Sequence, residues 1–331
     1  MTTTTAHIEA QAATFRECFS YLRTEIGRVF VGQRALVDHV LVCFFCQGHA
    51  LIEGPPGLGK TLLVRTLGEG LDLTFSRIQC TPDLMPADVT GTNLVAETAT
   101  GAREFSFRPG PIFANVVLAD EINRATPRTQ AAFLEALQER RVTVFGTSHP
   151  IAEPFAVFAT QNPLEMEGTY PLPEAQLDRF FFKLKVGMPG SEDLAEILAR
   201  TTGAQTVRVS PRFGAPVVQA MHALIRQVEV SEPSTRLVLR LVRATHPDAG
   251  EAPEIVQKYV KHGASVRAAQ AMILAAKALA LLDGRYHAAV DDVRSVALPA
   301  LNHRIIRNFH GEMERVTTEG IVEAVLAASD R

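Results

Sequence analysis

The segment that most constrains this chain is the run at residues 54–61, which reads GPPGLGKT. An apolar stretch at residues 49–53 precedes it and favours a β-strand, and leucines and a valine at helical spacing follow it. Glycines allow backbone N–H groups to surround a phosphate, and the start of a helix adds positive charge there. The strand–loop–helix context therefore predicts a nucleotide phosphate site, where Lys60 reaches the β- and γ-phosphates and the Thr61 hydroxyl binds Mg²⁺.

A pair of carboxylates at the end of another apolar run extends this prediction. Residues 115–120 are typical of a strand that is buried on both faces of a parallel sheet, and the run ends in Asp120 and Glu121. A phosphate loop needs a metal-orienting carboxylate at the end of a nearby strand. We expect Asp120 to hold Mg²⁺ through a water molecule, and Glu121 to polarise the water that attacks the γ-phosphate.

Strands alternate with helices between residues 48 and 186, which predicts an α/β fold with a parallel five-stranded sheet. Two β-hairpins are inserted, one around residues 98–101 and one across residues 142–151. Beyond residue 190 the patterns are helical, and we expect no further strand. The chain is therefore divided into a nucleotide-binding domain with N-terminal helices, residues 1–190, and an all-helical C-terminal domain, residues 191–331. The strands are expected at residues 49–53, 74–80, 115–120, 155–160 and 180–186.

Composition and charge exclude several classes of protein. Hydrophobic residues make up 47% and charged residues 21%, a globular balance that excludes disordered and low-complexity chains. Lys and Arg number 33 against 36 Asp and Glu, a net charge of −3, so no overall basic excess marks a nucleic-acid binder. The longest apolar run, residues 268–282, contains Gln270 and Lys277 and is shorter than the roughly 18–20 residues of a membrane span.

Two further segments bear on the cellular compartment and on metal binding. The N-terminus has no basic start followed by an apolar core, so we expect no secretory signal and a cytoplasmic location. Cys43 and Cys46 form a CxxC inside the apolar helical run VLVCFFC, and no second CxxC or paired His completes a zinc set. We interpret both cysteines as core packing residues.

Several motifs together resemble those of one protein family. The segments GPPGLGKT and VLADE look like the Walker A and Walker B motifs of AAA+ ATPases. The segments TPDLMPADVTG, FRPGP, DEINRA and LPEAQLDRF are similar to motifs of the MoxR family within that class. The resemblance covers about residues 25–310 and implies a P-loop AAA+ αβα sandwich with inserted hairpins, followed by an all-α lid domain. Residues 248–262 match the family least, and their role stays open.

The resemblance also implies roles for individual residues. Asn162 matches the sensor 1 residue that positions the attacking water, and Arg179, in LDRF, matches the arginine finger that reaches the ATP of a neighbouring subunit. Arg267 matches the sensor 2 residue at the start of a lid helix, and Gln79 matches a polar residue that can restrain the catalytic glutamate. The expected ATP contacts are Val31, Gly32, Gly54, Pro55, Pro56, Gly57, Leu58, Gly59, Lys60, Thr61 and Leu62.

Each of these residues also has an ordinary structural interpretation. Asn162 could cap a turn, and Arg179 could form a salt bridge with Asp178 or Glu174. Arg267 could be a solvated charge on a helix, and Gln79 a plain polar residue at a strand end. Residues 54–61 could likewise be a Gly/Pro-rich loop without a ligand.

Three functions are compatible with the sequence. The first is an ATP-hydrolysing, chaperone-like remodeller that forms a ring homo-oligomer, by resemblance a hexamer, without membrane insertion. By resemblance its partner is a von Willebrand A domain protein, for metal-cofactor insertion or complex maturation. The second is a magnesium-chelatase-like subunit or a DNA-associated AAA+ motor, although the acidic net charge and a hairpin tip without cations, residues 145–148, disfavour nucleic acid. The third is a nucleotide-gated scaffold without turnover, which the intact Lys60, Asp120 and Glu121 disfavour.

Overall fold

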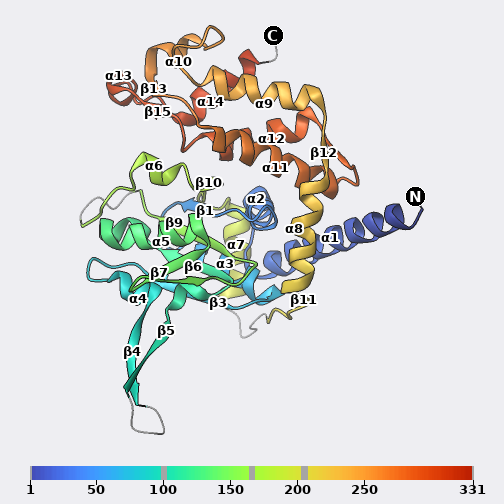
Figure 1. Cartoon of the computed structure of the whole chain (residues 1–331). Helices are drawn as coiled ribbons and strands as arrows, with labels where there is room; N and C mark the ends of the chain where they lie inside the picture. Colours follow the sequence, from blue (N-terminus) through green and yellow to red (C-terminus); the bar gives the residue numbers. More distant parts are fainter. Residues whose placement is uncertain (1, 98–102, 164–167, 203–207, 330–331) are drawn as a thin grey trace.

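The computed structural model describes residues 2–97, 103–163, 168–202 and 208–329, and Figure 1 shows how they are arranged. Five parallel strands form the central sheet in the order β10–β1–β9–β6–β3, which confirms the α/β fold. These strands are β1 (Ala50–Glu53), β3 (Phe75–Gln79), β6 (Val116–Asp120), β9 (Ala156–Gln161) and β10 (Phe182–Lys185).

Alternate residues of the sheet belong to two separate apolar cores. In β6, Val116 and Leu118 belong to the first core, Val117 and Ala119 belong to the second, and all four are fully buried. Burial on both faces accounts for the uninterrupted apolar sequence of this strand. The first core is covered by α1 (Thr2–Val29), α2 (Arg34–Phe45) and α3 (Lys60–Gly70), and the second by α4 (Pro86–Thr90) and α5 (Pro127–Glu139).

Two antiparallel hairpins leave the sheet domain. β4 (Gly91–Glu97) pairs with β5 (Arg103–Pro109) and projects away from the domain in Figure 1, while the expected turn at 98–101 lies outside the described residues. β7 (Arg141–Val144) pairs with β8 (Thr147–Pro150). The second turn consists of Phe145 and Gly146, whose φ angles of 48° and 80° suit a two-residue hairpin loop.

Helices form most of the chain beyond residue 190. In Figure 1 those from Glu232 onward lie above the sheet, whereas the helix Ser191–Thr201 lies at the level of the sheet. The apolar helix α11 (Val266–Leu282) is central, because it contacts α1 as well as α8 (Ala215–Gln227), α9 (Glu232–Ala244) and α12 (Val290–Leu301). This arrangement confirms a helical lid. The remaining helices are α7 (Ser191–Thr201), α10 (Glu254–Tyr259), α13 (Phe309–Met313) and α14 (Thr318–Ala328).

Three short strand pairs join this helical region, although the sequence predicts no strand there. β11 (Phe213–Gly214) pairs with β2 (Leu71–Asp72), β12 (Glu229–Val230) with β14 (His287–Ala288), and β13 (Val260–His262) with β15 (Ile306–Arg307). Strands of two or three residues are too short to show a period of two in the sequence. The β2–β11 pair joins the segment that follows α7 to the sheet domain.

Two further observations concern apolar segments. Cys43 and Cys46 are buried in the first core and form no disulfide, as expected for packing residues. Throughout the ranges that the structure describes, every helix is too short or too polar to cross a membrane.

Candidate nucleotide site

The glycine-rich loop connects β1 to α3 at the carboxyl end of the sheet. Gly57 and Gly59 have φ angles of 79° and 76°, which glycine adopts without steric cost. Gly54 lies against the strand end of β10, because a Cβ at this position would be 2.7 Å from the carbonyl oxygen of Val186. Glycine is therefore required at three positions of the loop, twice for its backbone angles and once for close packing.

Lys60 supplies a buried cation at the end of this loop. Its Nζ donates hydrogen bonds to the carbonyl oxygens of Gly54, at 2.6 Å, and of Pro55, at 2.7 Å. Burial lowers the pKa of the Lys60 ammonium, and the charges of Asp120 and Glu121 oppose this shift. An ammonium at the first residue of α3 adds to the positive end of the helix, so this position suits a multiply charged anion.

A cavity of about 270 Å³ opens beside the loop. It is lined by the loop, the start of α3 and the carboxyl ends of β3, β6 and β9. Of the residues expected from the sequence to contact ATP, five do not line it, as far as the chain is described: Val31, Gly32, Gly54, Pro55 and Leu62. The lining residues are Pro56, Gly57, Leu58, Gly59, Lys60, Thr61, Arg77, Gln79, Asp120, Glu121, Thr160 and Asn162.

Both carboxylate oxygens of Asp120 accept hydrogen bonds. Oδ1 accepts from the Thr160 hydroxyl at 2.6 Å, and Oδ2 accepts from Arg77, at 2.6 Å from Nη2 and 3.1 Å from Nε. The Thr61 hydroxyl oxygen lies 3.4 Å from the same Oδ2. Because Mg²⁺ prefers oxygen ligands, the Thr61 hydroxyl and the Asp120 carboxylate fit a magnesium site between them.

Glu121 follows Asp120 in an uncommon backbone conformation. Its φ and ψ angles, 57° and 51°, lie in the left-handed region that non-glycine residues rarely adopt. The Glu121 N–H donates to the Thr160 hydroxyl at 2.8 Å, which holds this turn. The Glu121 Oε2 accepts hydrogen bonds from Gln79 Nε2, at 3.2 Å, and from Arg124 Nη1, at 3.1 Å. Such fixed local strain is common where a side chain must be positioned for function.

Arg77 and Thr160 belong to this site although none of the motif segments quoted from the sequence contains them. Arg124, which contacts Glu121, lies in the DEINRA segment. Arg77 and Thr160 reach Asp120 because β3 and β9 flank β6 in the sheet, an order that local patterns do not reveal. The sequence gives one indication for Thr160, because it precedes Asn162, the expected sensor 1 residue, by two positions at the end of the same strand.

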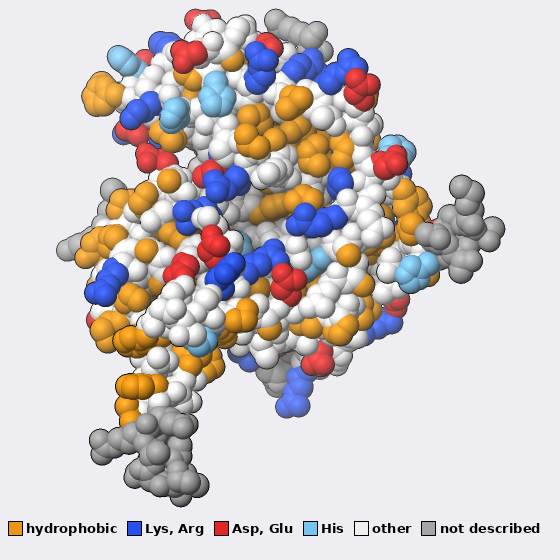
Figure 2. All heavy atoms as spheres, in the orientation of Figure 1, with side chains coloured by type: hydrophobic (Ala, Val, Ile, Leu, Met, Phe, Trp, Pro, Cys, Tyr) orange, Lys and Arg blue, Asp and Glu red, His pale blue; other side chains and the backbone are white. Residues whose placement is uncertain are grey.

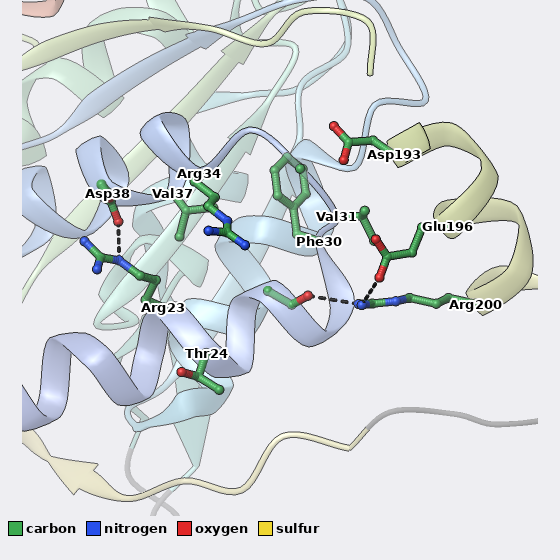
Figure 3. A pocket seen from close by; sticks show the side chains of 12 residues that line it. Arg23, Thr24, Phe30, Val31, Arg34, Val37, Asp38, Asp193, Glu196 and Arg200 are labelled. Atoms are coloured by element: carbon green, nitrogen blue, oxygen red, sulfur yellow. Dashed lines mark hydrogen bonds and ion pairs between the residues drawn. The ribbon is translucent and has the colours of Figure 1, made fainter. Parts of the chain in front are cut away.

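Val31 and Gly32 lie at the junction of α1 and α2, beside a second cavity of about 480 Å³ (Figure 3). Helix α7 forms part of its wall, and a Cβ on Gly32 would lie only 2.3 Å from Oδ2 of Asp193. Phe30 connects this cavity to the loop, because its ring lies 3.2 Å from where a Cβ on Gly59 would stand. The junction therefore borders the phosphate loop without lining the phosphate cavity.

Arg179 and Arg267 lie apart from the phosphate cavity of their own chain. They line a third cavity, of about 280 Å³, together with Arg140, Arg226 and Arg304. Figure 2 shows Lys and Arg side chains gathered in the hollow between the helical region and the sheet domain. The fold thus places the expected arginine finger and sensor 2 residue in one cationic cavity.

Asp178 connects the helical region to the sheet domain beside Arg179. Its carboxylate accepts hydrogen bonds from Ser265 at 2.6 Å, from Arg267 at 2.9 Å and from Arg304 at 3.0 Å. Burial raises the pKa of Asp178, but these hydrogen bonds and the Arg304 charge lower it further than burial raises it. Burial lowers the pKa of Arg304 to about 10, although Asp178 opposes this shift.

Family models match both parts of the chain. The model of the ATPase family associated with various cellular activities (AAA) matches residues 49–182, and the AAA lid domain model matches residues 252–325. The sheet topology, the loop and the helical lid together define an ATPase of the AAA class.

Similar proteins narrow this class. The chain is 41% identical over 309 residues to the uncharacterized protein YeaC of Bacillus subtilis, covering 92% of this chain and 91% of YeaC. It is 40% identical over 302 residues to Chaperone MoxR1 of Mycobacterium tuberculosis, covering 91% and 79%. A crystal structure from Cytophaga hutchinsonii, described as a candidate ATPase, matches with a TM-score of 0.90 and 38% identity over 98% of both chains. The chain belongs to the MoxR family of AAA+ ATPases.

Proposed function

We propose that this chain binds ATP with Mg²⁺ and hydrolyses it to ADP and phosphate. The observation that carries the proposal is the single cavity that Lys60, Thr61, Asp120, Glu121 and Asn162 line together. A bound Mg²⁺ would neutralise charge on the phosphate oxygens.

Each residue of this cavity has a distinct role in the proposed reaction. Lys60 binds the β- and γ-phosphates, and Thr61 and Asp120 hold the metal. Glu121 accepts a proton from the attacking water, and the Asn162 amide positions that water. The loop from Gly54 to Gly59 and the start of α3 up to Leu62 surround the phosphates, while the junction at Val31 and Gly32 borders the adenine base.

We propose further that the chain acts as a ring homo-oligomer, by family resemblance a hexamer. Arg179 and Arg267 lie in a cavity separate from their own phosphate site, which favours contact with the nucleotide of a neighbouring subunit. A head-to-tail contact of this kind generates a ring when the rotation closes. In this assembly each nucleotide is bound by two chains.

The proposed cellular role is chaperone-like remodelling of a protein partner in the cytoplasm. Support comes from the relative named Chaperone MoxR1. By family resemblance the partner has a von Willebrand A domain, and the outcome is metal-cofactor insertion or complex maturation. In this proposal residues 1–190 form the nucleotide-binding domain and residues 191–331 the lid domain.

Replacing Glu121 by Gln tests the hydrolysis step. The amide keeps the shape of the side chain but cannot accept the proton, so kcat should fall roughly 10²–10⁴-fold while ATP still binds. Phosphate release and binding of labelled ATP are the two measurements. The control Glu139→Gln, at the exposed end of α5, should change neither. Normal turnover in Glu121→Gln, or loss of ATP binding, contradicts the assigned role.

The same variant tests the partner. Glu121→Gln protein loaded with ATP should retain a purified von Willebrand A domain protein from the same organism, because the ring stays in its nucleotide-bound form. ADP-loaded protein should retain less. Equal retention with ATP, with ADP and without nucleotide contradicts a nucleotide-controlled partner.

A further inference from the structure

Arg77 lies in the phosphate cavity, where no motif assigns it a role. It stands on β3 opposite Leu118 of β6, and its guanidinium reaches the end of β6 to contact Asp120 Oδ2. The Arg77 side chain is 48% exposed, whereas that of Asp120 is only 11% exposed. The cation can therefore swing out into solvent, while the carboxylate is held in place.

The oxygen that Arg77 contacts is also the oxygen that the metal needs. Oδ1 of Asp120 is engaged by the Thr160 hydroxyl, and Oδ2 is the oxygen that lies 3.4 Å from the Thr61 hydroxyl. A guanidinium and a divalent cation repel each other strongly at such short range. Arg77 and the metal ion therefore compete for Oδ2.

Arg77 is also linked to Glu121 through a single side chain. Its Nη2, the atom 2.6 Å from Asp120 Oδ2, lies 2.7 Å from the Gln79 Oε1 as well. The Gln79 Nε2 in turn donates to Glu121 Oε2 at 3.2 Å. Because an amide has one acceptor and one donor end, Arg77 fixes which end of Gln79 faces Glu121. Movement of Arg77 away from Asp120 releases that constraint.

We propose that Arg77 is a positioning residue that competes with magnesium for Asp120 and so couples metal binding to the placement of Glu121. The proposal rests on the proposed function, since it takes Thr61 and Asp120 as the metal ligands. When Arg77 leaves Oδ2 to a metal ion, Gln79 loses its contact with Arg77 and its amide can turn away from Glu121. Glu121 is then held only by Arg124 among these side chains.

The first test measures metal affinity without turnover. Mn²⁺ replaces Mg²⁺, and its binding in the presence of ADP is followed by electron paramagnetic resonance. Arg77→Met should bind Mn²⁺ roughly tenfold more tightly, because a competing unit charge is removed from the ligand oxygen. The matched control Arg65→Met removes an equal charge from an exposed pair with Glu69 on α3, and should change the affinity by less than about twofold.

The second test separates charge from hydrogen bonding. Arg77→Lys keeps the positive charge, but one ammonium cannot reproduce the guanidinium fork that joins Asp120 to Gln79. Its Mn²⁺ affinity should stay within about threefold of the wild type. Gln79→Ala should change kcat severalfold in the wild-type background and less than about twofold in the Arg77→Lys background.

The outcomes distinguish this inference from the proposed function. Weaker or unchanged Mn²⁺ binding in a folded Arg77→Met protein overturns the competition, and an equal effect of Gln79→Ala in both backgrounds overturns the coupling. Thermal unfolding verifies that each variant is folded. Thr61→Ala and Asp120→Asn should lose Mn²⁺ binding, and if they retain it, the metal site itself is wrong whatever Arg77 does.

Discussion

At the scale of single residues, the Lys60 ammonium is a buried cation at the end of the glycine-rich loop, where it can contact a bound triphosphate. Replacing Lys60 by Ala should weaken ATP binding at least roughly tenfold, because hydrogen bonds to charged groups contribute about 1.5–3 kcal/mol each. The Kd for a fluorescent ATP analogue, measured with Mg²⁺ present, gives the answer directly.

A matched lysine provides the control for this prediction. Lys261 is exposed on β13, away from the loop, and its replacement by Ala should leave the Kd unchanged. An unchanged Kd in Lys60→Ala as well would show that the glycine-rich loop does not bind the phosphates.

Individual residues also show how much of the site could be predicted. Lys60 and Glu121 are identifiable because each lies in a short local motif. Arg77 is not, because its role depends on β3 lying beside β6, and the strand order arises from packing across the whole sheet. Arg179 and Arg267 are identified by resemblance, yet their common cavity arises only when the lid packs onto the sheet domain.

At the scale of elements, the base of the β4–β5 hairpin depends on two glycines that approach each other closely. Gly91 has φ and ψ angles of 88° and 178°, a region that only glycine adopts readily, and a Cβ there would lie 2.2 Å from the Arg108 carbonyl oxygen. A Cβ on Gly110 would lie 2.3 Å from the Val89 carbonyl oxygen. The direction in which this hairpin leaves the domain is set by that contact.

Two alanine substitutions separate backbone strain from this steric clash. Gly146→Ala, at the open turn of β7–β8, should lower the free energy of unfolding by about 1–2 kcal/mol, because φ is positive but no atom lies near. Gly91→Ala should lower it by at least about 3 kcal/mol, because strain and clash add. Urea unfolding of both variants makes the comparison, and equal losses would mean that the hairpin base tolerates a methyl group.

The strands also differ in whether their own sequence or a partner far away in the chain determines them. The five sheet strands are runs of at least four residues. β1, β6 and β9 are mostly apolar and β10 alternates apolar with charged residues, whereas β3 has only two apolar residues. β11, β12 and β14 span two residues each, and they are formed by distant partners rather than by their own sequence. The periodicity of the sequence predicts that the lid is helical, but it does not predict that the lid contacts α1.

At the scale of the whole molecule, the proposed completion of one site by two chains would make turnover depend on assembly. Arg179→Ala should bind ATP nearly normally but hydrolyse it roughly 10³–10⁵-fold more slowly, the range for arginine fingers supplied by a partner. Mixing it with Glu121→Gln protein should restore activity, because some sites then combine an intact Glu121 with a neighbour's Arg179. Phosphate release by the mixture, compared with each variant alone, measures this restoration.

Dilution supplies the control for this prediction. Specific activity of the wild type should fall once the concentration drops below the assembly range, which light scattering can follow in parallel. Flat activity on dilution, together with normal turnover in Arg179→Ala, would rule out a shared site.

The first apolar core continues without interruption from the sheet domain into the helical lid. Phe45 of α2, Met221 of α8 and Met272 of α11 belong to the same buried cluster. Swinging the lid open would expose this surface at a cost of roughly 25 cal/mol per Å². This cost disfavours separation of the lid from the sheet domain. In the proposed ring, movement driven by nucleotide turnover would then occur at the contacts between subunits, and whole chains tilting against each other would transmit force to a client.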